Sequence, residues 1–346
     1  MTLSEPDTRP KPSRPRRFGL YAPLVVLLVA ACAWSLGWFW LRGEVYRQMD
    51  GAARSWEEAG YRVDWASRTV SGFPFRLNVD AAGARLSDLS GWGLAAPRLK
   101  AEAFVFAPDH WVLVAPAGVV LQRPAGGPVV VGARILRASV SEAGGHPPRV
   151  SVEGFGLTFT PAPGGAPFGL ASAGALHLHT RAGPADQGAF YAEIDGARVR
   201  GPGLLNDVAA GAPLTLIADA IYSHAGALRG QGLARALRDW GDSGGTMAVR
   251  RLSLQTGPMT AEATSGTLDV GRDGRLRGAL IVKVKPAAGL MAALVAPSRL
   301  TPETSKAAQA VLASHSQGDV AVVTVDFQAG QTTLGPVAIG ASPRIY

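Results

Sequence analysis

The longest apolar stretch of the chain runs from Phe18 to Leu41 and contains no charged side chain. A helix that rises about 1.5 Å per residue needs about 20 apolar residues to cross the hydrocarbon layer of a bilayer. The stretch therefore predicts a transmembrane helix over residues 18–41. Basic residues gather before it, at Arg9, Lys11, Arg14, Arg16 and Arg17. Because cytoplasmic flanks are rich in Lys and Arg, we expect residues 1–17 to form a disordered cytoplasmic tail and residues 42–346 to lie across the membrane.

The same stretch has a second interpretation. The segment from Val29 to Cys32 (VAAC) resembles the lipobox of bacterial lipoproteins, whose cysteine is lipidated after cleavage. A cleaved lipoprotein continues into a polar tether, but here apolar residues follow as far as Leu41. We therefore favour an uncleaved anchor, while the alternative, in which Cys32 is a cleaved lipidation site, stays open. Both interpretations place the body outside the cytoplasm.

The spacing of apolar residues changes twice after the anchor. Trp38, Phe39 and Trp40 are expected to form an aromatic belt at the far membrane interface. Residues 42–60 then have helical spacing, which predicts a juxtamembrane helix that ends at Gly60. From Tyr61 the period becomes two over residues 61–65 and again over 75–79, which predicts a half-buried β-hairpin.

The remainder of the chain predicts many strands. Short apolar runs between residues 99 and 200 are separated by turns rich in Gly and Pro, as in an antiparallel meander. Helical spacing returns near residues 228–240, 287–295 and 302–314, the last with Thr301 as N-cap, and strands are expected over 246–256, 259–270, 276–285, 320–328 and 331–339. We predict a mainly β fold with a few helices (α+β), in which a large curved antiparallel sheet forms a first unit (61–226) and a second unit with helices (227–346).

Two short motifs in the chain are similar to those of a known bacterial family. The turn and strand Gly72 to Leu77 (GFPFRL) and the C-terminal segment Leu334 to Gly340 (LGPVAIG) resemble the bacterial envelope family catalogued as domain of unknown function 2125. The resemblance implies an N-terminal anchor and an extracytoplasmic β-rich body, and it supplies no activity. In architecture alone, such bodies also resemble AsmA-like and tubular lipid-binding proteins, in which a curved sheet presents an apolar groove.

Composition narrows the possible partners. The net charge is +8, but five basic residues against two acidic ones in the tail supply three of these charges. No cluster of Lys and Arg with interleaved aromatic residues occurs after the anchor, so we expect no nucleic-acid partner. The single cysteine, Cys32, lies within the apolar stretch, so an intrachain disulfide and a thiolate metal cluster are impossible.

Three patterns invite a chemical interpretation. Gly241 to Gly245 (GDSGG) matches the surroundings of a serine-protease nucleophile, but a helix precedes Ser243 and a strand follows it, which favours a helix-to-strand turn. His177 and His179 share one face of a strand and lack a third metal ligand nearby, so we interpret them as surface residues. Lys283 and Lys285 also share a face, and we interpret them as protection of an edge strand.

We therefore expect a non-enzymatic protein with no catalytic, cofactor or metal site. It would be a single-pass protein of the inner membrane with its bulk in the periplasm, and its partners would be the lipid bilayer and lipid or other envelope proteins. The first hypothesis is that the curved sheet binds or conveys a lipid or another hydrophobic ligand. The alternative is a structural or assembly partner in the envelope without a small-molecule ligand, and the remote alternative is a serine hydrolase that uses Ser243.

Overall fold

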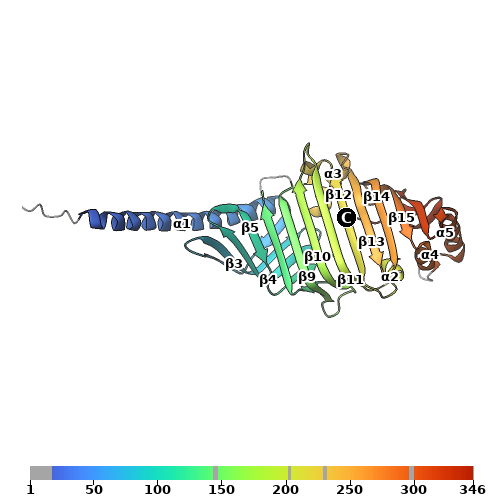
Figure 1. Cartoon of the computed structure of the whole chain (residues 1–346), viewed down its shortest axis with the longest axis horizontal. Helices are drawn as coiled ribbons and strands as arrows, with labels where there is room; N and C mark the ends of the chain where they lie inside the picture. The colour runs from blue at the N-terminus through green and yellow to red at the C-terminus, as the bar shows by residue number, and fades with distance from the viewer. Residues whose placement is uncertain (1–17, 143–146, 202–203, 229–231, 296–299, 346) are drawn as a thin grey trace, which may run out of the picture.

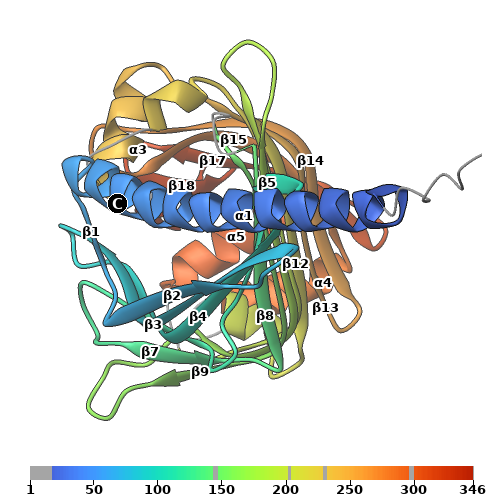
Figure 2. The same ribbon diagram turned by 90° about the vertical axis from the view of Figure 1, so that its left-hand side faces the viewer.

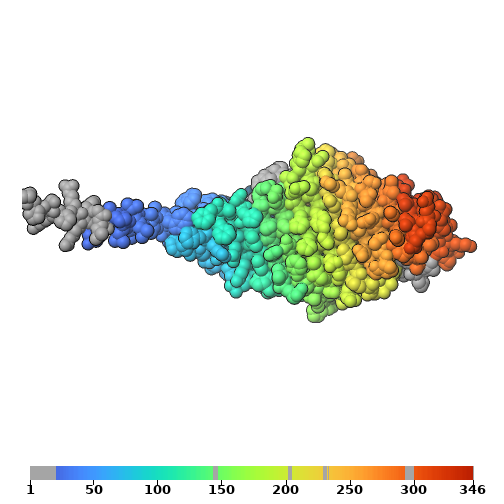
Figure 3. Space-filling model, in the orientation of Figure 1, coloured from blue at the N-terminus to red at the C-terminus, as the bar shows by residue number. Residues whose placement is uncertain are grey.

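The fold described here is that of a computed structural model, which describes residues 18–142, 147–201, 204–228, 232–295 and 300–345. The predicted cytoplasmic tail, residues 1–17, lies outside these ranges. The molecule is elongated: helix α1 projects from one end of a broad sheet, and helices α4 and α5 lie at the other (Figure 1). The space-filling view shows the same long body with the helix extending from it (Figure 3). The predicted fold class, mainly β with a few helices, is confirmed.

Helix α1 spans Phe18–Glu58 without interruption, so the predicted anchor and the predicted juxtamembrane helix are one element. It is the one described helix that is long and apolar enough to cross a membrane. Gly60, with a φ of 79°, follows the helix and turns the chain into the first strand. Such a φ is accessible to Gly because it has no Cβ, which explains why the helix ends here.

The described strands form a single sheet in which every pairing is antiparallel. Most strands pair with their neighbours in sequence, as a meander requires. Two long strands each pair with two shorter strands along one edge. Strand β4 pairs with β5 and β6, and β9 pairs with β7 and β8. The sheet then continues in order from β9 to β15, and β15 pairs with β17. Its strands are β1 (Tyr61–Asp64), β2 (Ser67–Ser71), β3 (Arg76–Asp88), β4 (Gly93–Phe104), β5 (Ala107–Val114), β6 (Val119–Gln122), β7 (Val129–Gly132), β8 (Ile135–Ser141), β9 (Arg149–Pro161), β10 (Leu170–Ala182), β11 (Gly188–Val199), β12 (Leu214–Tyr222), β13 (Met247–Thr256), β14 (Met259–Val270), β15 (Leu276–Lys285), β16 (Ser316–Gln317), β17 (Val320–Gln328), β18 (Gln331–Leu334) and β19 (Val337–Ala341).

The other helices are short and lie around this sheet. They are α2 (Leu204–Ala209), the 3-10 helix η1 (Ala225–Leu228), α3 (Leu233–Asp242), α4 (Ala287–Val295) and α5 (Pro302–Ser314). Thr301 is the N-cap of α5, as predicted, and its hydroxyl accepts a hydrogen bond of 3.3 Å from the Thr304 backbone N–H. In α5, Ala308 and Leu312 are fully buried against β17 and β18. Figure 2 looks from the α1 end and shows the strands curving around α1 and α5.

Several predicted elements differ from the structure. The predicted hairpin of residues 61–65 and 75–79 is wrong, because β1 pairs with the far half of β3, with Tyr61 opposite Asp88. The first half of β3 pairs instead with β2, which the sequence placed in a turn. Strand β12 and helix α2 were not predicted. The predicted strand over residues 331–339 is split at Gly335, whose φ is 54°.

The strands on either side of the predicted boundary at residues 226–227 pair with each other. Leu216 of β12 lies opposite Leu254 of β13, and the ladder extends over the whole of β12. The two β-rich units therefore share one continuous sheet, and their division into separate folding units stays a prediction.

Candidate functional site

One row of apolar residues crosses almost the whole sheet. In each pairing the residue in this row lies directly opposite the next, so all of them face the same side. The row consists of Val70, Val79, Ala101, Leu113, Ala138, Val152, Leu178, Ala192, Ala218, Leu252, Ala263, Val282 and Val323. Adjacent strands lie about 4.8 Å apart, so the twelve steps of the row extend over about 58 Å.

The opposite face of the same strands is polar. The row next to the apolar one consists of Ser71, Asn78, Glu102, Val112, Ser139, Ser151, His179, Tyr191, Asp219 and Arg251. Ion pairs add to this face, among them Arg98 with Asp80 and Arg137 with Glu153. The sheet is therefore amphipathic along its length, and one of its two faces is built to exclude water.

Helices cover the apolar face at its two ends. At the first end, Trp38 and Val45 of α1 are buried against Val70, Leu77 and Val79. At the other end, α4 and α5 pack on β15 and β17. Between them, the row from Leu113 to Leu252 is half-buried. Beside it on the middle strands lies a buried cluster that includes Leu157, Ala173 and Leu214, to which Ala209 of α2 contributes. We call this curved apolar face, from β3 to β15, the trough.

The trough contains a distinct apolar groove beside α1. Its volume is about 630 Å³, and it lies between the second half of the helix and strands β1, β3 to β6 and β8. Val45, Met49 and Ala52 line it from the helix, at the apolar spacing that predicted the juxtamembrane segment. The sheet contributes Leu86, Leu99, Trp111, Leu113 and Val140, among others. Acyl chains and other flexible apolar groups suit a lining of this composition.

A ridge along α1 attaches the helix to the sheet beside this groove. The ridge carries residues four apart, which lie on one side of a helix. The Trp34 and Trp38 indole N–H groups donate to the carbonyls of Pro74 and Arg76, each at 3.0 Å. Further along, the Tyr46 hydroxyl accepts a 3.0 Å hydrogen bond from the Val70 N–H, on the edge of β2 that faces away from β3. The helix thus satisfies polar groups of a sheet edge that would otherwise face solvent or a partner.

The last contact of the ridge is ionic. Arg68 of β2 donates to the Asp50 carboxylate at 2.7 Å, and this hydrogen bond lowers the pKa of Asp50. The Arg68 guanidinium also lies over the rings of Trp65 and Tyr46, 4.8 and 5.3 Å from their centroids. Arginine suits this position because its planar group can stack and pair at the same time. Trp38, which the sequence places at the far membrane interface, is 4% exposed and packs on Leu77 and Val79 of the sheet, and its depth in a membrane stays a prediction.

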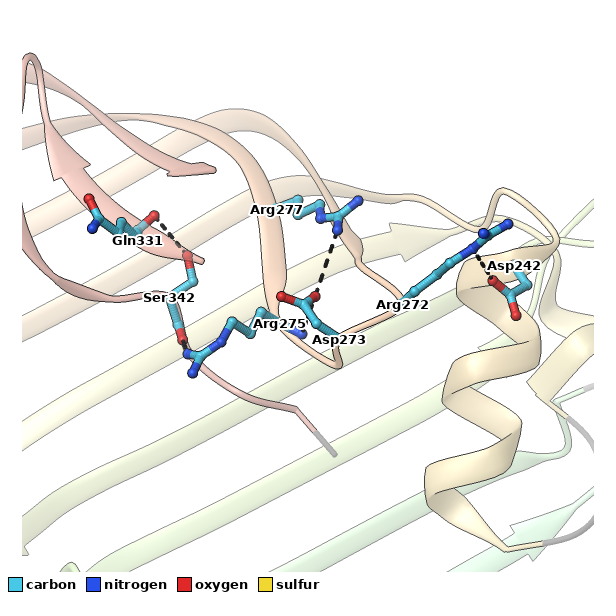
Figure 4. Close-up of polar contacts among 7 residues, drawn as sticks. All are labelled: Asp242, Arg272, Asp273, Arg275, Arg277, Gln331 and Ser342. Atoms are coloured by element: carbon cyan, nitrogen blue, oxygen red, sulfur yellow. Dashed lines mark hydrogen bonds and ion pairs between the residues drawn. The ribbon is translucent and has the colours of Figure 1, made fainter. Parts of the chain in front are cut away.

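Ser243 is the C-cap of α3, between that helix and β13. Its hydroxyl donates to the Trp240 carbonyl at 2.7 Å, as a turn residue would. The preceding Asp242 binds Arg272 of the β14–β15 turn at 3.2 Å (Figure 4). The same close-up shows Arg275 donating to the Ser342 carbonyl, which ties the C-terminal segment to the sheet. These contacts join α3 and the chain end to neighbouring strands.

His177 and His179 lie on the polar face of β10, with ring centroids 6.4 Å apart. Both are half-buried, and His179 Nδ1 lies 2.6 Å from the Ser151 hydroxyl. Over the described ranges, no group of three His, Cys, Asp or Glu side chains is placed to hold a metal ion. The interpretation of Lys283 and Lys285 as edge protection is wrong, because β15 lies inside the sheet between β14 and β17.

The residues that line the trough were not singled out from the sequence. Alternation within each strand predicts which residues share a face, but it does not align one strand with the next. One signal was present: apolar residues recur at every second position of β12, at Leu214, Leu216, Ala218 and Ala220, with Thr215 and Asp219 among the residues between them. The pairing of distant strands turns such local patterns into one continuous surface.

No curated protein and no solved structure matches the chain. A family model described as an uncharacterized protein conserved in bacteria, DUF2125, matches residues 38–343. The match begins at Trp38, within the ridge that attaches α1 to the sheet, and ends just before the last residues. It thus includes the trough, the second half of α1 and helices α4 and α5. The chain belongs to the DUF2125 family.

Proposed function

We propose that this protein is anchored in the inner membrane of bacteria by the first half of α1 and binds the acyl chains of a lipid, or another hydrophobic chain, in the periplasm. The observation that carries the proposal is the half-buried apolar row of the trough. Leu113, Val152 and Leu178 are large apolar side chains that the protein's own helices leave in partial contact with solvent. A contiguous apolar row of about 58 Å that is only partly covered is typical of binding sites for apolar ligands or membranes.

The direction of the trough supports a ligand that comes from the membrane. Its first end lies against α1, the helix that is apolar enough to span a bilayer, and the row then leads away from it. A chain lying across the strands could exchange one apolar contact for the next at intervals of about 4.8 Å. Each CH₂ group kept out of water stabilises binding by about 0.8 kcal/mol.

Site-specific photo-crosslinking in intact cells tests this proposal. A photo-reactive phenylalanine analogue replaces Leu178 in one variant and His179 in a second. The two positions are adjacent on β10, both are half-buried, and they face opposite sides of the sheet. We expect lipid adducts at position 178 and few at 179. Equal labelling at both positions, or a protein adduct without lipid at 178, contradicts lipid binding, and the second result favours an assembly partner.

We further propose that the protein acts without catalysis of its own. The hydroxyl of Ser243 is engaged with a backbone carbonyl at the end of α3, where it stabilises a helix terminus. A fluorophosphonate probe should therefore leave the wild-type protein unlabelled. Labelling that is lost in Ser243→Ala would show that the serine is a nucleophile and would revive the hydrolase alternative.

A further inference from the structure

Six aromatic rings meet where α1 first touches the sheet. Trp34 of the helix forms one triangle with Phe75 and Phe106, whose ring centroids are 6.0 to 6.3 Å apart. Trp38 and Phe39 form a second triangle with Phe73, with centroids 5.3 to 6.4 Å apart. The phenylalanines at 73, 75 and 106 belong to the β2–β3 and β4–β5 turns. We call these six residues the aromatic collar.

The collar is exposed. Trp38 is buried, but the other five rings are 39% to 70% exposed, with Phe106 the most exposed of them. Apolar surface of this kind is unfavourable in water by roughly 25 cal/mol per Å². Three such rings at two turn tips, with two more beside them on α1, therefore call for an apolar partner that covers them.

The position of the collar on α1 indicates which partner. Trp34 lies 16 residues after Phe18, the start of the apolar stretch, or about 24 Å along the helix. A hydrocarbon layer about 30 Å thick that begins at Phe18 extends about 6 Å beyond Trp34. The Pro74 carbonyl of the β2–β3 turn accepts the Trp34 hydrogen bond. This turn therefore lies at the same depth as a part of α1 that is within the hydrocarbon layer.

The backbone at these tips is suited to a medium without water, where an unpaired polar group is costly. Four of the five carbonyls from Gly72 to Arg76 accept a hydrogen bond. The Gly72 carbonyl accepts from the Arg76 N–H and the Phe75 carbonyl from the Val105 N–H. The Pro74 and Arg76 carbonyls accept from the two Trp indoles. Pro74 itself has no N–H to satisfy.

We propose that the tips of the β2–β3 and β4–β5 turns insert into the lipid bilayer beside α1, with Phe73, Phe75 and Phe106 among the acyl chains of the periplasmic leaflet. This inference rests on the proposed anchoring by α1. The body is then held on the membrane by three elements rather than by one helix. The sheet begins within the leaflet, so the apolar groove beside Val45 and Met49 lies directly above its surface.

Depth measurements with single cysteine labels test the insertion. The full-length protein is reconstituted in vesicles of phosphatidylethanolamine and phosphatidylglycerol and labelled with an environment-sensitive fluorophore. The wild-type label at Cys32 reports on the anchor, because it is the only cysteine of the chain. In a Cys32→Ala background, Phe106→Cys and Phe73→Cys report on the two turns. Leu89→Cys is the matched control: it is 85% exposed and follows the opposite end of β3, about 40 Å from the collar.

We expect labels at positions 106 and 73 to emit at shorter wavelength and to be quenched by spin-labelled phospholipid, as the label at Cys32 is, while the label at 89 stays in water. If Cys32 is quenched but 106 and 73 are not, insertion is wrong and the anchor stands. If Cys32 is also in water, the proposed anchoring fails and the inference fails with it. Two turn positions are used so that one misfolded variant, identified by circular dichroism, leaves the other to decide.

Discussion

A bulky side chain placed in the middle of the trough would decide whether the apolar face is open. Ala218 lies in the part of the row that no described helix covers, between Ala192 of β11 and Leu252 of β13, and it is half-buried. We choose Ala218→Trp because the indole would project from the sheet into the space where a ligand is proposed to lie. Ile217→Trp is the control, since the adjacent residue projects from the opposite face of the same strand.

The change that Ala218→Trp makes in the free energy of unfolding has opposite signs for an open and a filled trough. A Trp side chain buries about 200 Å² when fully covered, so half of that, kept from water at about 25 cal/mol per Å², stabilises by about 2.5 kcal/mol. In a trough already filled by the protein, the same change would overpack it and cost about 1–3 kcal/mol. We therefore expect the free energy of unfolding of Ala218→Trp to be unchanged or raised. A loss within the overpacking range would refute an open trough.

The same variant tests passage along the row. If the indole excludes three CH₂ groups of a bound chain, binding weakens by about 2.4 kcal/mol, or about 50-fold. For a ligand that enters beside α1, photo-crosslinking of lipid should fall at Leu252, beyond the obstruction, and persist at Leu113, before it. Ile217→Trp should leave both signals intact. Unchanged crosslinking at Leu252 in Ala218→Trp would show that the chain does not run along the trough.

Three further variants test how the body is held together. Leu77→Ala removes a fully buried side chain between α1 and β3 and should destabilise the protein by about 2–5 kcal/mol in thermal unfolding, whereas Leu89→Ala at an exposed turn should have little effect. Asp50→Asn should remove the loss of hydrogen-exchange protection that we expect in β2 at acid pH, measured relative to intrinsic exchange at each pH. The pKa of Asp50 is lowered, so its pairing with Arg68 stabilises fully above the ordinary carboxyl pKa of about 3.9 and is lost as pH falls through the lowered value. Thr301→Ala should cost about 1 kcal/mol of unfolding free energy, and Thr301→Ser should restore it; equal losses in both would contradict the N-cap role.

The parts of the fold that were predicted correctly depend on residues close together in sequence. The strands 259–270 and 276–285 and helix 287–295 match the structure, because alternation, an Asp-Gly turn and apolar spacing are local signals. Strand β2 was missed because Val70 is its one buried residue, so a five-residue segment carries almost no alternation. The pairing of β1 with the far half of β3 was also missed. That register joins Tyr61 to Asp88, and no local pattern specifies it.

By itself the sequence determined that an apolar helix of membrane-spanning length precedes a β-rich body, because the length and alternation of apolar runs set these directly. The tertiary structure alone decided what those elements form together. Residues as distant as Val70 and Val323 came to lie in one apolar row, since each antiparallel pairing preserves the side on which a residue projects. Phe75 and Phe106 likewise met Trp34 of α1, and Phe73 met Phe39, only because two turns of the sheet fold back onto the helix. Contacts between residues far apart in the chain depend on how strands align, and that alignment is specified by packing of the whole sheet rather than by any one segment.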